Sequence, residues 1–337
     1  MKINKENIQS LFTQFSKAVV LIIGDVMLDD YLIGNVSRIS PEAPVPIVDI
    51  KERYACLGGA ANVALNIKSL GAKPILCSVI GKDAKSVSFL ETMQKEQLST
   101  EGIVQSSNRI LTTKYRAIGN NMQLLRLDNE ITHPLIDEDE KKFLHHLHRI
   151  IETQKIDAII FEDYDKGVIT PQVIQNIVSL AGKKGIPVTV DPKKRNFMDY
   201  HNISIFKPNW KELKEGLSLS DARWDDASLL QKLQEFMQQQ QHENILLTLG
   251  GDGMLICRFK DSKFTHTHIE ACRRNIADVS GAGDTVISVA TLCWILGMDM
   301  EDIALLSNFA GGLVCEEVGV VAVDKDKFMQ EIQCFVS

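Results

Sequence analysis

Gly281, Ala282, Gly283 and Asp284 combine a flexible backbone with one carboxylate at the start of an apolar stretch. The periodicity after them predicts a buried helix that begins near Gly283. The first N–H groups of a helix lack intrahelical acceptors, and with the positive end of the helix dipole they suit a phosphoryl group. Asp284 would lie beside that group and could take the proton of an attacking hydroxyl. A plain helix cap is the alternative, because Asp and Ser often cap helices.

A second segment of small residues precedes another predicted helix. Gly58 and Gly59 allow the backbone to approach a ligand closely, and Asn62 follows them. Asp25, at the end of the first predicted strand, and Asn62 can both hydrogen-bond sugar hydroxyls. Tight packing of small residues against a helix is the competing interpretation.

Two further segments could bind a nucleotide and a hard cation. Asn209 and Glu212 lie three residues apart, and oxygen ligands of this kind suit Mg²⁺ with retained waters. The same spacing is typical of a helix capping box. The other segment follows an apolar strand and is equally compatible with a β-turn; it contains Thr248, Gly250, Gly251 and Gly253.

Basic side chains gather on a predicted β-hairpin. Lys114 and Arg116 are two apart, so they project from one face of their strand, and Arg126 lies on the other strand. Cations that face one way can hold a sugar phosphate. An ordinary solvated strand face is the alternative.

These residues need a scaffold of alternating strands and helices. Short apolar runs predict buried strands over 18–23, 74–80, 157–161, 187–190, 203–206 and 245–249. Helical patterns lie between most of them, over 62–70, 84–97, 138–153, 171–183 and 227–240. The alternation predicts an α/β fold, doubly wound, with a mostly parallel sheet and helices on both faces. Residues 31–56 and 110–128 break the pattern and predict a small β lid within a single domain of 1–337.

Charge and hydropathy exclude several classes of protein. The net charge of −7 argues against a general nucleic-acid binder, so an anionic ligand must be held by local Lys and Arg. The polar start and the short apolar runs predict neither a signal peptide nor a membrane span, and hence a cytoplasmic protein. The chain also lacks the G-x-x-x-x-G-K-[ST] pattern of a P-loop.

Taken together, these segments resemble the ribokinase-like (PfkB) carbohydrate kinases over essentially the whole chain. The motifs occur in order: Gly24-Asp25, GGAAN at 58–62, the hairpin, Asp191-Pro192-Lys193, NWKE at 209–212, TLGGDG at 248–253 and GAGDT at 281–285. A narrower set is similar to the kinase domain of the heptose 7-phosphate kinase/ADP-heptose synthase group: GDVMLD at 24–29, SRISPEAPVP at 37–46 and DYDKG at 163–167.

The resemblance implies roles for the residues at the transfer site. Asp284 would be the general base when a sugar hydroxyl attacks the γ-phosphate of ATP, with the N–H groups of residues 281–283 stabilising the developing charge. Asn209 and Glu212 would organise Mg²⁺ through water. ATP would also contact the 248–253 loop and Asn308.

On the acceptor side, the resemblance implies a sugar phosphate. Asp25, Gly58, Gly59 and Asn62 would contact the sugar. The phosphate groups would be held by Arg38, Lys114, Arg116, Arg126 and Lys193. The expected reaction is phosphorylation of D-glycero-β-D-manno-heptose 7-phosphate at O1, toward ADP-heptose and the lipopolysaccharide core.

Other expectations follow from the same resemblance. The chain has no HxGH motif, so no nucleotidyltransferase domain is expected, and lids of this kind predict a homodimer. The expected partners are therefore a small sugar phosphate, ATP and a second copy, with no nucleic acid or membrane. A ribokinase-like kinase of another sugar, sugar phosphate or nucleoside is one alternative, and a non-catalytic sugar-sensing protein is another.

Overall fold

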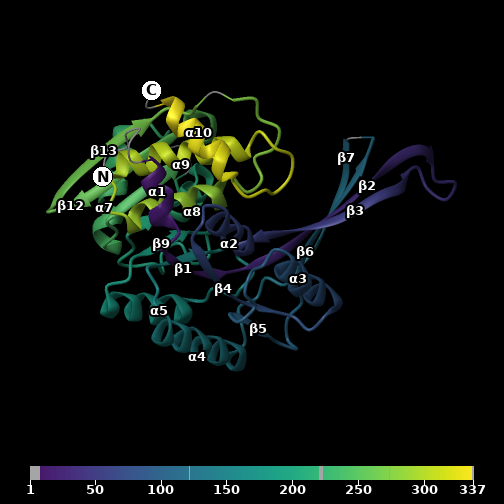
Figure 1. Cartoon of the computed structure of the whole chain (residues 1–337), viewed down its shortest axis with the longest axis horizontal. Coiled ribbons are helices and arrows are strands. Elements are labelled where there is room, and N and C mark those ends of the chain that lie inside the picture. Colours follow the sequence, from purple (N-terminus) through teal and green to yellow (C-terminus); the bar gives the residue numbers. More distant parts are fainter. Residues whose placement is uncertain (1–7, 121, 220–222, 273, 336–337) are drawn as a thin grey trace.

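A nine-stranded sheet forms the centre of the computed structural model, which describes residues 8–120, 122–219, 223–272 and 274–335 (Figure 1). Its order is β13-β12-β11-β10-β9-β8-β1-β4-β5, and all neighbours from β5 to β11 run parallel. The strands are β1 (Val19–Gly24), β4 (Lys73–Ile80), β5 (Ile103–Gln105), β8 (Ala158–Glu162), β9 (Val188–Asp191), β10 (Ile205–Phe206), β11 (Asn244–Thr248), β12 (Met254–Lys260) and β13 (Lys263–Ile269). β12 and β13 are added antiparallel.

The central strands bury both of their faces. In β1, Val20 and Ile22 belong to one hydrophobic cluster, whereas Leu21 and Ile23 belong to the other. Successive side chains of a strand point to opposite faces, so the continuous apolar run requires a cover on each side. This is why the chain alternates strands with amphipathic helices.

Helices cover the sheet on both faces, as the sequence predicts. One face packs against α1 (Ile8–Phe15), α2 (Ala60–Ser69), α3 (Ala84–Lys95), α8 (Ala282–Ile295), α9 (Met300–Val314) and α10 (Lys325–Phe335). The other packs against α4 (Asp137–Thr153), α5 (Pro171–Lys184), α6 (Trp210–Gly216) and α7 (Ala227–Gln240). Figure 1 shows α4 and α5 below the sheet and α8 to α10 above it. The predicted doubly wound α/β class is confirmed.

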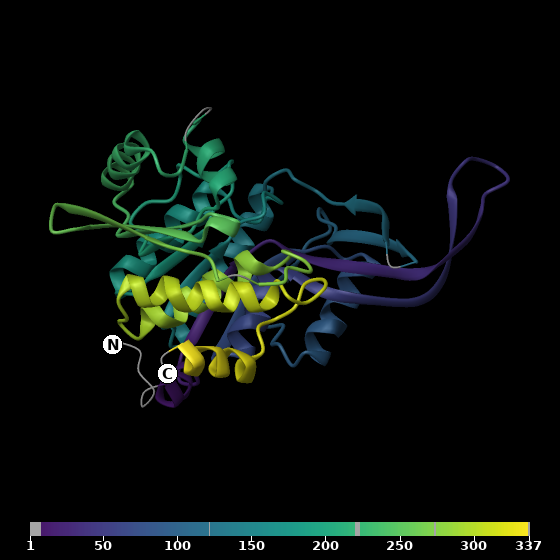
Figure 2. The same ribbon diagram turned by 90° about the horizontal axis from the view of Figure 1, so that it is seen from above.

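The two inserted segments form a second sheet of four strands, in the order β3-β2-β6-β7. Its strands are β2 (Val26–Ile39), β3 (Pro46–Gly59), β6 (Thr112–Gly119) and β7 (Met122–Asn129). This lid reaches far out from the body of the molecule (Figure 2). Asn120 takes the positive φ, 52°, that the predicted hairpin turn needs, and Asn121 beside it lies outside the described residues.

Within the described ranges, no helix combines the length and the apolar character needed to cross a membrane.

Candidate active site

Asp284 lies in the first turn of α8, next to the carboxyl ends of the parallel strands. Its side chain is only 3% exposed. Oδ2 accepts a hydrogen bond from Nδ2 of Asn62 at 2.7 Å, and Oδ1 accepts one from the hydroxyl of Tyr164 at 2.8 Å. Asn62 comes from α2 and Tyr164 from the loop after β8, so three separate elements fix this carboxylate.

The surroundings of Asp284 set its proton affinity. Burial raises the pKa of Asp284 to about 6, although the hydrogen bonds from Asn62 and Tyr164 act to lower it, and Asp191 raises it further. Burial also raises the pKa of Tyr164 well above its ordinary value, so the phenol keeps its proton and remains a donor. A carboxyl group with a pKa near 6 is mostly ionised above pH 6, and such a carboxylate is suited to general-base catalysis.

The turn before Asp284 has the backbone that the two glycines predict. Gly281 is the N-cap of α8 with a φ of 82°, in the left-handed region that favours glycine. The N–H of Ala282 donates to the carbonyl of Val279 at 3.3 Å, whereas among the described residues neither Gly281 nor Gly283 has an acceptor for its N–H. Of the three predicted anion donors, two are therefore directly available.

Asp278 holds this turn in place. Its Oδ1 accepts from the N–H of Ser280 and its Oδ2 from the N–H of Gly319, each at 3.0 Å. Burial alone would raise the pKa of Asp278, but these backbone donors outweigh it and lower the pKa. The turn before Asp284 is thus anchored by the carboxylate of Asp278.

The GGAAN segment delivers Asn62 to the site and also approaches the lid. A Cβ at Gly58 would lie 2.5 Å from Oδ2 of Asp29, and one at Gly59 would lie 2.5 Å from the carbonyl of Asp25. Both glycines are therefore required by the close approach of β2 and β3. Tight packing and delivery of a ligand-binding residue are both features of this segment.

Asp25 accepts backbone hydrogen bonds through both of its carboxylate oxygens. Its Oδ2 accepts from the N–H groups of Tyr164 and Lys166, at 2.9 and 3.1 Å, and its Oδ1 accepts from Val168 at 3.0 Å. With both oxygens engaged and only 1% of the residue exposed, Asp25 shapes the loop that carries Tyr164. Its predicted contact with the sugar stays a prediction.

The predicted lid cations do share one face. In the register of the lid, Lys114 lies opposite Asp128 and Arg116 lies opposite Arg126. Arg116 is paired with Asp29, and Arg126 holds Asp128 with two bonds of 2.8 and 2.7 Å.

Lys114 connects this face to the transfer site. Its Nζ lies 5.5 Å from the centre of the Tyr164 ring, and Tyr164 in turn bonds Asp284. Burial lowers the pKa of Lys114, and the nearby Arg126, Lys166 and Arg116 act in the same direction. Crowded cations of this kind favour the binding of an anion.

Two predicted phosphate ligands lie in unexpected surroundings. Arg38 is exposed near the outer end of β2, opposite Ile47, and a strand of this length spans roughly 45 Å. Within one chain, the structure therefore does not bring Arg38 to Asp284. Lys193 lies close to the site but is paired with Glu212 and lies 5.2 Å from the centre of the Tyr164 ring. Burial acts to lower the pKa of Lys193, but the Asp191 and Glu212 carboxylates outweigh it and raise the pKa.

Asn209 and Glu212 form the capping box of α6. Oδ1 of Asn209 accepts from the N–H of Glu212, and Oε2 of Glu212 accepts from the N–H of Asn209, both at 2.8 Å. The remaining oxygen of Glu212 binds Lys193. Among the described residues, no group of three or more His, Cys, Asp or Glu could hold a metal ion. The predicted role of Asn209 and Glu212 toward Mg²⁺ stays a prediction.

The predicted nucleotide loop joins this capping box. Thr248 forms a parallel bridge with Asn209, so the two segments lie side by side. Gly250 has a φ of 60°, and a Cβ there or at Gly251 would meet nothing within 4 Å. Gly253 is required for packing, because its Cβ would lie 2.0 Å from the carbonyl of Ile269.

Asn308, on α9, donates to the carbonyl of Glu270 at 2.8 Å and so fastens the end of β13. Its predicted contact with adenine stays a prediction.

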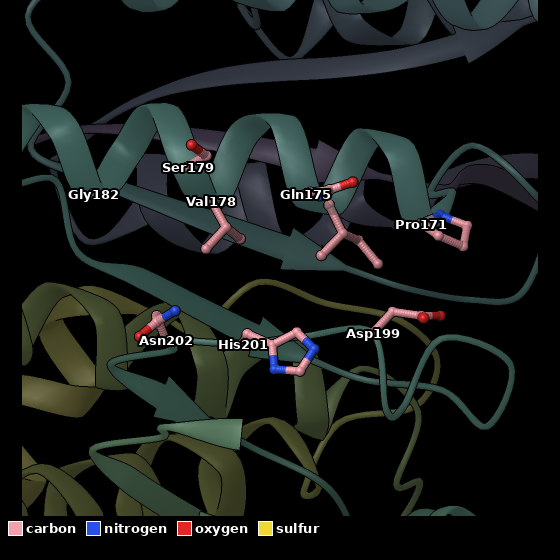
Figure 3. Close-up of a pocket in the computed structure, with 9 residues that line it drawn as sticks. Pro171, Gln175, Val178, Ser179, Gly182, Asp199, His201 and Asn202 are labelled. Carbon is pink, nitrogen blue, oxygen red and sulfur yellow. The ribbon is translucent and has the colours of Figure 1, made fainter. Parts of the chain in front are cut away.

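A groove of about 600 Å³ lies elsewhere, between α5 and residues 199–202 (Figure 3). Val178, Asp199 and His201 line it, and none of the predicted site residues does. Because α5 and α8 cover opposite faces of the sheet, this groove does not belong to the site around Asp284.

Comparisons with known proteins identify the family. Residues 17–327 match the pfkB family carbohydrate kinases. This chain belongs to the pfkB family. The bifunctional protein HldE of Methylobacillus flagellatus is 38% identical over 314 residues, covering 93% of this chain and 63% of that protein. The HldE of Helicobacter pylori is 35% identical over 301 residues, covering 89% and 63%. The chain thus spans a little under two thirds of the length of these relatives.

Solved structures agree on the pfkB fold. Phosphofructokinase-2 from Escherichia coli, in complex with potassium, superposes with a TM-score of 0.75 at 18% identity, covering 95% of this chain and 99% of that one. Ribokinase from Arabidopsis thaliana, complexed with ribose and ATP, gives a TM-score of 0.68 at 15% identity, with coverages of 94% and 98%. The resemblance inferred from the sequence is confirmed at the level of family and fold.

The geometry gives contacts to residues of this pfkB chain to which the motifs assigned no role. Tyr164 donates a hydrogen bond to Asp284, and Asp29 is a buried partner of a lid cation. Lys207 is 2% exposed and lies 2.7 Å from Asp191. Their common signal is a polar residue directly after a buried strand or at the base of the lid, where ligands of open α/β sheets bind.

Proposed function

We propose that this protein transfers the γ-phosphate of ATP to O1 of D-glycero-β-D-manno-heptose 7-phosphate, in the route to ADP-heptose. Membership of the pfkB carbohydrate kinases supports the reaction class. The observation that carries the acceptor class is the chain of contacts from Asp284 through Tyr164 to Lys114, because it joins the transfer site to a cationic lid face. A base at one end and cations at the other suit a sugar that already bears a phosphate.

The proposed chemistry assigns a defined task to each side chain. Ionised Asp284 orients the acceptor hydroxyl and takes its proton, while Asn62 and Tyr164 hold the carboxylate in position. The N–H groups of Gly281 and Gly283 stabilise charge on the transferring phosphoryl group. Mg²⁺, oriented through waters on Asn209 and Glu212, would neutralise the nucleotide phosphates.

On the acceptor side, the phosphate of the sugar would displace carboxylates that already pair with the lid cations. Arg126 holds Asp128 on an exposed strand, where an ion pair contributes only about 0–1 kcal/mol. Arg116 and Asp29 are more buried, so we expect that pair to persist and to position Lys114 and Arg126.

The lid also supports the proposal of a homodimer. Every residue of β7 is exposed, and the strand is an edge of its sheet. Leu125 and Leu127, on the face opposite Arg126, are 52% and 56% exposed. An apolar face beside an unpaired strand edge favours pairing with a second copy.

A substrate panel tests the proposal. Purified protein with ATP and Mg²⁺ is offered heptose 7-phosphate, the unphosphorylated heptose, fructose, fructose 6-phosphate and adenosine, and products are identified by ³¹P NMR. We expect a 1,7-bisphosphate from heptose 7-phosphate and much slower turnover of the others, and the Asp284→Asn variant should form this product far more slowly than wild type. Preferred use of fructose or adenosine would replace the heptose assignment. Sugar binding without any phosphorylated product would favour the sugar-sensing alternative.

A further inference from the structure

Three charged side chains form a row beneath the first turn of α8. Glu162 ends β8, Asp191 ends β9 and Lys207 directly follows β10, and these strands are neighbours in the sheet. Glu162 and Asp191 are register partners, and the N–H of Lys207 bonds the carbonyl of Val190 at 2.8 Å. The backbone of the sheet therefore fixes the row.

Side-chain alternation directs the row toward α8. Ile160 and Ile205, two residues before Glu162 and Lys207, belong to the cluster that packs on α8, and Thr189 Oγ1 lies 2.7 Å from Thr291 Oγ1 of α8. Residues two apart on a strand share a face.

The glycine at the start of α8 confirms how close the row lies to the anion-binding turn. A Cβ at Gly283 would lie 3.4 Å from Asp191 Oδ2 and 3.5 Å from Lys207 Nζ.

Among the described residues, both acids of this row have carboxylate oxygens without a hydrogen-bond partner. Lys207 Nζ lies 2.7 Å from Asp191 Oδ2. In the described part of the chain, Asp191 Oδ1 has no hydrogen bond, and Lys193 Nζ is 3.6 Å away from it. Glu162 is 0% exposed, and neither of its oxygens has a partner in the same described ranges.

The groups around Glu162 do not supply the missing donor. Those that act on it are Asp191, Asp284, Lys193, Lys207, Tyr164 and Tyr200. Tyr164 donates to Asp284, Tyr200 donates to Asp163, Lys193 binds Glu212 and Lys207 binds Asp191. A buried carboxylate without a donor is costly unless it carries its own proton. Burial, with Asp191 and Asp284 acting in the same direction, raises the pKa of Glu162 well above its ordinary value.

We propose that Glu162 is protonated and that its carboxyl group donates a hydrogen bond to Oδ1 of Asp191. The two carboxyl groups then form a proton-sharing pair. This pair positions Lys207 beneath the anion-binding turn of α8. The pair holds one negative charge, and Lys207 balances it from the other oxygen of Asp191. Both acids are positioning residues that act through Lys207. The proton-sharing pair is inferred from the positions of these residues, whereas its effect on phosphoryl transfer rests on the proposed function.

The first test is the pH dependence of stability. A group whose pKa is raised by folding contributes stability that is complete below its unfolded pKa and is lost as the pH rises toward its folded pKa. The Glu162→Gln variant has no carboxyl group at this position, so it does not lose stability in this way as the pH rises. We therefore expect the urea midpoint of Glu162→Gln, relative to wild type, to increase steadily from pH 5 to pH 8. Glu138→Gln, an exposed substitution on α4, should show no such trend over the same range. A constant or shrinking difference for Glu162→Gln would overturn the proton-sharing pair.

A second readout needs no variant. At pH 8 we expect infrared spectra of the wild-type protein to contain a protonated-carboxyl band that moves when glutamate is labelled with ¹³C at its side-chain carboxyl. Asp163 and Asp284, whose pKa values are also raised by burial, contain no label, so neither contributes to a label-sensitive band. Absence of a label-sensitive band would overturn the pair even if Glu162→Gln failed to fold.

The third measurement tests the effect on catalysis. Ionisation of Glu162 would bring a second negative charge next to Asp284 and the phosphoryl group, so the kcat of wild type should fall at alkaline pH. We expect the alkaline fall to be several-fold smaller in Glu162→Gln. An identical alkaline profile in both proteins would overturn the positioning of Lys207. A wild type without kinase activity would instead refute the proposed function, and the stability and infrared measurements would still decide the pair.

Discussion

The transfer site and the lid are built in opposite ways. Asp284 and Asn62 are 3% and 0% exposed and hydrogen-bond each other between two helices of the body. Every residue of β7 in the lid is exposed, and its Arg126 is paired with Asp128 two residues away on the same strand. Protein hydrogen bonds therefore fix the carboxylate of Asp284, whereas Arg126 of the lid is held by an exposed acid.

This contrast has a physical basis. A buried carboxylate needs donors in fixed places, because leaving it without them costs more than a hydrogen bond contributes. Exposed ion pairs contribute little and exchange readily. Under the proposed function, catalysis depends on the body, and the choice of acceptor depends on the lid.

The largest effect is expected from Asp284→Asn, which tests the transfer site. Turnover should fall by roughly 10²–10⁴-fold, the usual contribution of a general base, while circular dichroism and thermal unfolding show a folded protein. Because the pKa of Asp284 is about 6 and the base must be ionised, the kcat/KM of wild type should fall about tenfold per pH unit below that value. A variant that retained turnover would remove Asp284 from the mechanism.

A smaller effect is expected from Lys114→Ala and Arg126→Ala in the lid. Each should raise the KM for the sugar phosphate by about 10- to 100-fold, because a hydrogen bond to a charged group contributes about 1.5–3 kcal/mol. The KM for ATP should stay close to the wild-type value in steady-state assays. Lys142→Ala, an exposed change on α4, is the matched control. Equal increases in the KM for ATP and in the KM for the sugar phosphate would contradict the proposal that the lid alone binds the acceptor.

Tyr164→Phe tests the link between the two regions. Loss of the 2.8 Å hydrogen bond removes a donor that favours ionised Asp284, so the pKa of Asp284 should rise further. The acid limb of kcat/KM should move up by about one pH unit. Tyr200→Phe, which removes a buried hydroxyl from Asp163 instead, should leave that limb in place.

The smallest effect on chemistry is expected from Leu125→Asp combined with Leu127→Asp. Both side chains are exposed, so the fold should persist, while sedimentation should show a shift from dimer to monomer. An unchanged sedimentation coefficient at the same concentration would place the dimer contact elsewhere.

Much of the fold follows from local patterns. Buried runs such as residues 74–80 and 157–161 are apolar throughout and are separated by amphipathic helices, so both the parallel sheet and its two-sided cover could be predicted. The lid could be predicted as well, because Gly119 and Asn120 interrupt two strand-like segments. The ends of these elements differ by only a few residues from the predicted ones.

The candidate site was predicted less evenly. Asp284 and Asn62 do meet, although they are 222 positions apart in the chain. Asp25 and Glu212 also accept hydrogen bonds from backbone N–H groups, and the predicted motifs did not indicate these bonds. Arg38 lies at the far end of a long strand, and the spacing of residues says nothing about how far a strand leads away from the body.

By itself, the sequence determined the class of this protein: an α/β carbohydrate kinase with a glycine-rich turn before one carboxylate and a basic hairpin. These features are local, since periodicity, turn residues and motifs act over a few positions. Only the tertiary structure decided that Tyr164 bonds Asp284 beneath Lys114, and that Glu162, Asp191 and Lys207 line up under α8. Such contacts depend on the order of strands in the sheet, which brings distant strand ends to one edge, and no local pattern encodes that order.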